Sequence, residues 1–177
     1  YVAPVLAAAE PGSATAIGHA QKMSAADAAL VNGTAAHGED FDDTFEGGPI
    51  HAGAVMVPAV LAAAEKFGLS GDAVLQGIAA GAEAACRLST VIPKAVHKAG
   101  FHPTSVFGTP AAALAVGAAM GLPAEKLAGA VGIAGSMASG IIEYLAEGAW
   151  TKRMHPGWAA QGGLRAAVLA QHGFFGP

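Results

Sequence analysis

Alanine and glycine together fill roughly two-fifths of the 177 residues, far above ordinary usage, and this constrains the fold more than any other feature. Alanine is the strongest helix former, and glycine lets two helices approach closely because it has no side chain. Only 6% of the residues are aromatic, so the core has to consist of small and aliphatic side chains. We therefore expect an all-α fold, a close-packed multi-helix bundle that forms a single helical domain over residues 1–177.

Cap and stop residues divide the chain into helical segments. Ser24, Ser70 and Pro123 are typical of helix starts, and Gly68 and Gly121 are typical of helix ends. One segment, Ala14–Gly18, hints at a short strand. The pattern predicts helices over Ala28–His37, Ala54–Phe67, Asp72–Leu88, Thr109–Met120 and Ala159–His172. A further helix is predicted to begin at Leu122–Pro123 and to include the apolar run Leu127–Ile142.

The longest apolar run, Leu127–Ile142, tests whether the chain enters a membrane. The run falls short of the ~20 apolar residues that cross a bilayer, so we expect a buried helix and no membrane association. Gly132, Ser136 and Gly140 recur every four positions, which on a helix makes a smooth ridge for close packing. We expect this ridge to pack within the bundle or across a homodimer.

Charge and cysteine content exclude several classes of protein. The formal net charge is −4 with only 9 Lys and Arg residues, so we expect no nucleic-acid partner. The single cysteine, Cys86, excludes an internal disulfide and a four-cysteine metal site, and we expect it to be buried in a cytoplasmic protein. The chain starts without methionine and without a basic signal region, so we expect a fragment or processed product with no secretion signal.

The polar residues gather in clusters, two of them in the first third of the chain. Residues 37–44 combine a histidine with four carboxylates, at positions 39, 40, 42 and 43. If a helix continues through them, His37, Asp40 and Thr44 share one face. His51 stands just before a predicted helix, where its ring and free backbone N–H groups could face an anion. A solvated acidic helix end is the alternative interpretation of the first cluster.

Two further clusters lie later in the chain. His102 is followed by Pro103, which fixes the direction of the histidine outside helical geometry. Lys152, Arg153 and His155 form the only dense cationic patch, and it lies between two tryptophans, which indicates a partly dry site that binds a carboxylate. Exposed surface turns are the alternative for both. Together the clusters suit a small anionic substrate that undergoes proton transfer, and no nucleotide-binding fingerprint is present.

Four motifs in order resemble those of the MmgE/PrpD family, which includes 2-methylcitrate dehydratase, cis-aconitate decarboxylase and iminodisuccinate epimerase. The motifs are Asn32–His37, Asp40–Thr44 followed by His51, Gly100–Thr104 and Thr151–Gly157. The resemblance implies a large helical domain, a smaller α+β lid domain, a homodimer, and neither a metal nor an organic cofactor. Family members extend beyond this chain at both ends, so we expect the lid and a further active-site lysine to lie outside residues 1–177.

Carried over to this chain, the resemblance implies an active site lined by Asp40, Thr44, His51, His102 and Lys152. Lys152 would hold substrate carboxylates and stabilise the enolate-like charge at the reacting carbon. A histidine would carry the proton, Asp40 would orient it, and Thr44 would donate a hydrogen bond to a carboxylate. We expect Arg153 and His155 of the cationic patch to bind the substrate.

These observations predict a lyase that acts on a small di- or tricarboxylate. Its reaction would begin with proton removal next to a carboxylate and end with elimination of water, as in a hydro-lyase. Decarboxylation and epimerisation share the first step and stay open. Two other classes also stay open, a metal-dependent hydrolase with His37, Asp40 and Asp43 as ligands, and a non-catalytic helical dimerisation module.

Overall fold

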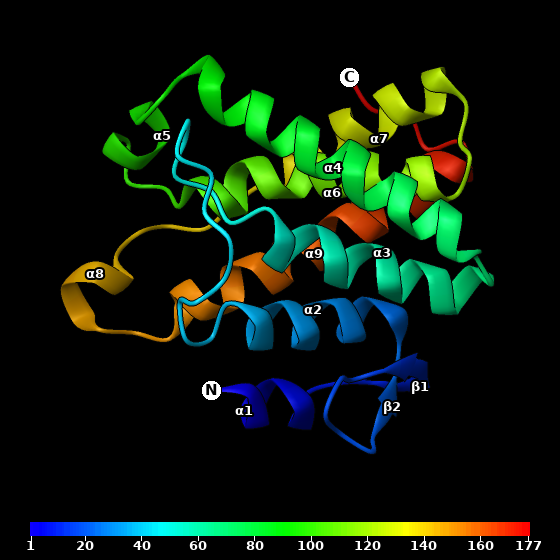
Figure 1. The fold of residues 1–177 in the computed structure, drawn as a ribbon, viewed down its shortest axis with the longest axis horizontal. Helices are drawn as coiled ribbons and strands as arrows, with labels where there is room; N and C mark the ends of the chain where they lie inside the picture. The colour runs from blue at the N-terminus through cyan, green and yellow to red at the C-terminus, as the bar shows by residue number, and fades with distance from the viewer.

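Helices make up most of the computed structural model, which describes residues 1–177 (Figure 1). Two short strands lie near the N-terminus and form the only sheet. The all-α prediction is therefore confirmed. The elements are α1 Val2–Ala7, β1 Pro11–Thr15, β2 Lys22–Met23, α2 Ala25–Ala36, α3 Gly53–Phe67, α4 Gly71–Val91, α5 Ala95–Lys98, α6 Pro103–Ala119, α7 Ala124–Met137, α8 Tyr144–Glu147 and α9 Thr151–Gln171.

Helices α6 and α9 lie at the centre of the bundle. Helices α3 and α7 pack against both of them, α4 packs against α6, and α2 packs against α9. Small side chains make these contacts possible, because a Cβ atom built on Gly81 would lie 2.5 Å from that of Ala115, and one on Gly33 would lie 2.5 Å from the Cα of Gly157. The core is accordingly rich in alanine, as the composition predicts.

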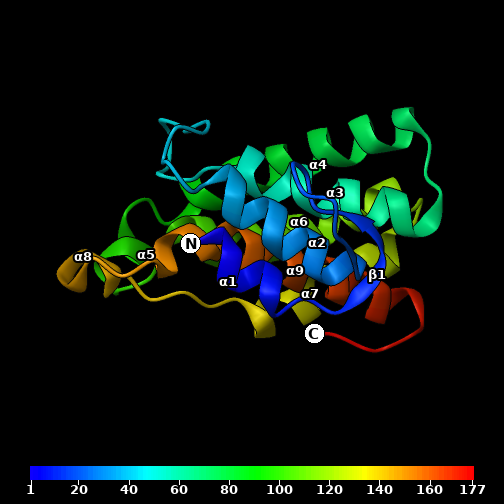
Figure 2. The same cartoon turned by 90° about the horizontal axis from the view of Figure 1, so that it is seen from below.

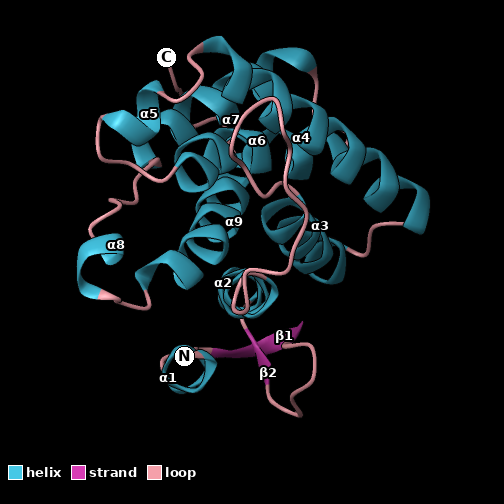
Figure 3. Ribbon diagram, turned by 60° about the vertical axis from the view of Figure 1, so that its left-hand side comes forward, coloured by secondary structure: helices cyan, strands magenta, loops and turns pink.

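The two strands pair antiparallel beside α2 (Figure 3). Ala14 lies opposite Met23 and Thr15 lies opposite Lys22. The strand predicted at Ala14–Gly18 overlaps β1 only at Ala14 and Thr15, because β1 starts at Pro11 and ends at Thr15. Its partner β2 is too short to show an alternating pattern in the sequence.

Two helices begin earlier than the sequence predicts. Helix α6 begins at Pro103, since a proline in the first turn of a helix loses no internal hydrogen bond. Helix α9 begins at Thr151, eight residues before the predicted start, and contains Pro156. The cationic patch, expected in a loop, therefore lies on the first turns of a helix.

Two other helices end earlier than expected. Helix α7 ends at Met137, so Gly140 lies beyond it and the predicted ridge with Gly132 and Ser136 is wrong in its last member. Gly140 has φ +111°, a conformation that glycine adopts most readily. Helix α2 ends at Ala36, so the expectation of one helical face shared by residues 37, 40 and 44 is also wrong.

Two sequence predictions about burial can be compared directly with the structure. Cys86 lies half-buried on α4 rather than fully buried, and it has no disulfide partner. None of the helices combines the length and the apolar character that crossing a membrane would require.

Candidate active site

Four helix ends meet at one end of the bundle, which lies at the left in Figure 1. They are the C-terminal end of α2 and the N-terminal ends of α3, α6 and α9. The connection over residues 37–52 extends outward at this end, as Figure 2 shows from below. Polar side chains distant in the sequence gather there: His37, Asp40, Asp42, His51, His102, Tyr144, Lys152 and His155.

An ion pair joins the outer connection to α9. The Nζ of Lys152 donates to Oδ2 of Asp40 at 2.6 Å, although 112 residues separate the two in sequence. This hydrogen bond lowers the pKa of the Asp40 carboxyl below its ordinary value. Asp40 has φ +55°, a left-handed conformation that aspartate tolerates better than most residues. The structure thus holds the carboxylate in one position beside the ammonium group.

The ring of His51 has a defined orientation. Its Nδ1 lies 2.9 Å from the carbonyl oxygen of Asp43, and its backbone N–H donates to Oγ1 of Thr104 at 3.2 Å. Because a carbonyl oxygen only accepts, Nδ1 carries the hydrogen, and Nε2 of the neutral ring is free to accept a proton. That Nε2 lies 4.0 Å from Oδ1 of Asp40. Oγ1 of Thr44 lies 3.4 Å from Nδ1.

His37 is buried behind the same carboxylate. Its Nδ1 lies 3.0 and 2.9 Å from the two carboxylate oxygens of Asp42, and its Nε2 is buried with no hydrogen-bond partner. This Nε2 lies 4.0 Å from Oδ1 of Asp40. Burial lowers the pKa of His37, and the hydrogen bond with Asp42 opposes that shift.

His102 and His155 form a buried pair. Their Nδ1 atoms lie 3.1 Å apart, so one ring donates and the other accepts. Burial lowers the pKa of His102 to about 2 and that of His155 to about 4, which keeps both rings neutral at pH 7. The ring of Tyr144 lies 5.7 Å from each of them, and burial raises the pKa of its hydroxyl.

The structure brings all five residues of the expected active site to this one end, namely Asp40, Thr44, His51, His102 and Lys152. Of the two residues expected to bind substrate, His155 is also there. Arg153 lies at the same end but has other partners: its Nε donates to the carbonyl oxygen of Gly38 at 2.8 Å and its guanidinium lies over the ring of Tyr1. Arg153 therefore ties α9 to the N-terminus of the chain.

The metal-ligand set of His37, Asp40 and Asp43 does not form. Both carboxylate oxygens of Asp43 accept the backbone N–H of Gly53, at 2.9 and 3.1 Å, and so satisfy the start of α3. Asp42 takes its place in a cluster whose possible ligand atoms all lie within 4.8 Å of one another: His37, Asp40, Asp42 and His51.

Sequence reasoning missed the individual roles of Asp42 and Tyr144. The sequence shows that Asp42 belongs to the acidic cluster, but it does not show that its carboxylate faces His37. No sequence signal marks Tyr144, whose place depends on the path of the chain between α7 and α9.

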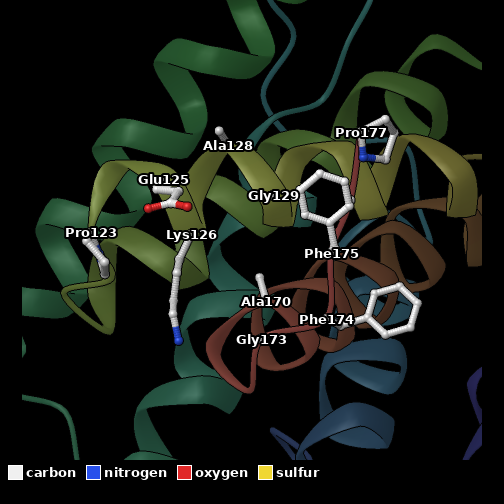
Figure 4. Close-up of a pocket in the computed structure, with 11 residues that line it drawn as sticks. Pro123, Glu125, Lys126, Ala128, Gly129, Ala170, Gly173, Phe174, Phe175 and Pro177 are labelled. Atoms are coloured by element: carbon white, nitrogen blue, oxygen red, sulfur yellow. The ribbon is translucent and has the colours of Figure 1, made fainter.

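Two cavities lie near the ends of the bundle. One, of about 500 Å³, borders the histidine pair and is lined by Tyr144, His155, Trp158 and other residues. The other, of about 430 Å³, lies between α7 and the C-terminal tail, where Figure 4 shows Lys126 and Phe174. Of these two cavities, the first shares Tyr144 and His155 with the gathered polar residues and adjoins the end of the bundle that carries Lys152, so it is the candidate substrate cavity; Asp40, His51 and Lys152 are not among its lining residues.

Comparisons with known proteins identify the family of this chain. The family profile described as "MmgE/PrpD N-terminal domain" matches residues 2–177. A cis-aconitate decarboxylase of Aspergillus terreus is 32% identical over 180 residues, which cover 98% of this chain and 36% of that protein. The human cis-aconitate decarboxylase is 38% identical over 161 residues, 84% of this chain and 31% of that protein.

A cis-aconitate decarboxylase-like protein of Aspergillus oryzae, oryM, is 34% identical over 173 residues, 93% of this chain and 36% of that protein. The chain thus spans about a third of the length of these curated relatives. Residues 2–177 match one domain of one family. The chain belongs to the MmgE/PrpD family and corresponds to the N-terminal domain of its members.

Proposed function

We propose that the protein containing this domain is a lyase that acts on a small di- or tricarboxylate. One observation carries the proposal: the ammonium of Lys152, the carboxylate of Asp40 and the free Nε2 of His51 face one another at the end of the bundle. This combination supplies a cation for a substrate carboxylate and a base for the neighbouring carbon. The relatives named cis-aconitate decarboxylase support the same substrate class.

The residues divide the work as follows. Lys152 binds a carboxylate and stabilises the negative charge that develops on the adjacent carbon, an effect that grows where water is excluded. Nε2 of His51 exchanges a proton with the substrate, since Nδ1 already donates to the carbonyl of Asp43. Asp40 holds Lys152 in place until the substrate arrives. The cavity beside His155, about 500 Å³, has the size of a small-molecule site.

Decarboxylation is the first reaction to test, because the relatives bear that name. The bond to the departing carboxylate breaks, its electron pair stays on carbon, and a protonated histidine supplies a proton to that carbon. Elimination of water, the reaction expected from the sequence, needs the same cation but the opposite proton transfer at carbon: a neutral histidine removes the proton next to the carboxylate, and the hydroxyl group takes up a proton and leaves as water. It is the second reaction to test.

The proposal includes a homodimer that needs no metal or organic cofactor and a cytoplasmic setting. Side chains alone supply the base and the cation. Large apolar side chains remain exposed on this domain, among them Phe41 at 95% and Val91 at 72%, and a second copy or the rest of the protein would cover them.

The test uses the full-length protein and a panel that includes cis-aconitate and 2-methylcitrate, with release of CO₂ and loss of water as separate readouts. Lys152→Met should lower kcat/KM by roughly 100- to 1,000-fold, the typical effect of losing one charge-stabilising donor. The exposed Lys98 gives the control Lys98→Met, which should leave kcat/KM unchanged. Equal turnover by the Lys152 and Lys98 variants would contradict the site. No turnover of any panel member would favour the non-catalytic dimerisation module.

A further inference from the structure

Two hydrogen-bond acceptors face each other inside the site with no hydrogen between them. The Nδ1–H of His37 donates to Asp42, so Nε2 of the neutral ring carries a lone pair. This Nε2 is buried, lacks any partner, and lies 4.0 Å from Oδ1 of Asp40, which also only accepts. A buried polar atom without a partner is costly and rare. One added proton, together with an approach of about 1 Å by the two atoms, would turn this 4.0 Å separation into a hydrogen bond.

The charges of the site explain why that proton is missing and when it would be needed. Lys152 brings one positive charge, whereas Asp40 and Asp42 bring two negative charges. Arg153 forms no ion pair with either carboxylate, because its Nε donates to the carbonyl oxygen of Gly38 and its guanidinium lies over Tyr1. A substrate with two or three carboxylates therefore meets a site with too little positive charge, and Lys152 is already paired with Asp40. The buried histidines can supply further positive charge if they take up a proton. His37 has the best counter-ion, because a carboxylate oxygen of Asp42 lies 2.9 Å from its Nδ1.

We propose that His37 takes up one proton from solvent when a carboxylate substrate enters, pairs through Nε2–H with Asp40, and so releases Lys152 to bind the substrate. The proposal rests on the proposed function, because it requires an anionic substrate. The step balances: solvent gives one proton, one N–H bond forms at Nε2, and Lys152 keeps its charge while it changes partner from Asp40 to the substrate carboxylate. Asp42 stabilises the imidazolium from the other side.

The surroundings of His37 fit this exchange. The titratable and charged groups that face it are Asp40, Asp42 and His51 from the connection, His102 from α6, and Lys152 and His155 from α9. Without substrate, burial and the ammonium of Lys152 both favour the neutral ring. Movement of Lys152 towards the substrate removes one of these effects, and the substrate's negative charge favours the imidazolium.

The experiment measures proton uptake on binding rather than turnover. Tricarballylate, a saturated tricarboxylate that cannot lose water, is titrated into the full-length protein by calorimetry at pH 7.5 in phosphate and in Tris, whose ionisation enthalpies differ. We expect uptake of close to one proton per site. Between pH 7 and 8.5 the association constant should then fall by up to tenfold per pH unit.

Variants assign that proton to His37. In His37→Gln we expect uptake to fall close to zero and binding to weaken about tenfold or more, and Asp42→Asn should reduce uptake because the imidazolium loses its counter-ion. Two controls leave the site alone: His172→Gln replaces an exposed histidine, and Glu39→Gln removes a carboxylate of the same connection that accepts from Tyr1. Circular dichroism checks that each variant folds. Should a variant fail to fold, ¹⁵N spectra of labelled wild-type protein decide, since His37 should change from neutral to doubly protonated on binding.

Each outcome supports or contradicts the proposal. Binding without proton uptake, or equal uptake by wild type and His37→Gln, would overturn it and leave the proposed lyase function intact. If tricarballylate, citrate and cis-aconitate all fail to bind, the proposed substrate class is wrong. The proposed proton uptake by His37 is then wrong as well.

Discussion

Lowering the pH should destabilise this domain through the buried pair of His102 and His155. Both rings are 5% exposed or less, and burial holds their pKa values at about 2 and about 4, against 6.5 for a free ring. Below pH 6.5 the unfolded chain therefore binds protons that the folded chain does not, and stability falls with pH. The loss starts near pH 6.5 and continues until the pH approaches the folded values.

The magnitude follows from the size of these shifts. At pH 5 each ring costs about 2 kcal/mol, and the pair costs about 4 kcal/mol, since one pH unit corresponds to about 1.4 kcal/mol per proton. A typical domain has only about 5–15 kcal/mol of stability, so the loss is large. Carboxylates with lowered pKa values, such as that of Asp40, act only at lower pH.

Urea unfolding at pH 7.5 and 5.0, followed by circular dichroism, measures the effect. In the double variant His102→Asn/His155→Asn we expect the difference between the two pH values to shrink by about 4 kcal/mol, because the amide side chains do not titrate. Replacing the exposed His19 by asparagine should leave the difference unchanged. The same pH difference in the double variant and the wild type would refute the reasoning.

Three further predictions follow from the site and its support. His51→Gln should lower kcat/KM by roughly 100-fold or more, as for loss of a general acid–base, and pH profiles of both proteins would show whether a titrating limb disappears. Dialysis against EDTA should leave turnover unchanged; loss of turnover that zinc restores would instead favour the metal-dependent hydrolase. Gly33→Ala should lower the free energy of unfolding by about 1–3 kcal/mol in urea titrations, because its Cβ would lie 2.5 Å from the Cα of Gly157. The control Gly129→Ala should not destabilise the domain, because a Cβ at that position meets no atom within 4 Å.

Local signals in the sequence located the helices well where a side chain caps them. Oγ of Ser24 accepts the N–H of Asp27, and Oγ of Ser70 accepts the N–H of Ala73, as the cap pattern predicts. Prolines caused the main errors, because Pro110 and Pro156 lie inside helices that the sequence predicted to begin only at Thr109 and Ala159. The neighbouring helices stabilise these segments enough to outweigh one lost hydrogen bond, which is a tertiary effect that local patterns do not contain.

Sequence motifs give residue types but not the directions of the side chains. The motifs assigned both Lys152 and Arg153 to the site, and in the structure Arg153 points towards Gly38 and Tyr1. Consecutive residues on a helix face directions about 100° apart, so a patch read as a loop could not separate Lys152 from Arg153. The sequence likewise could not separate Asp42 from Asp43. In the connection Asp42 faces His37, whereas Asp43 accepts the N–H of Gly53 at the start of α3.

The contact between Gly33 and Gly157 sets the dimensions of the site. It lies about one turn from His37 at the end of α2 and about one turn from Lys152 on α9, and it joins main chain to main chain. Rotamer changes and substitutions among the surrounding alanines leave such a contact in place. The residues around the cavity near α8 could therefore change while the packing of α2 against α9 stayed constant. Variants designed to alter that cavity should accordingly keep both glycines.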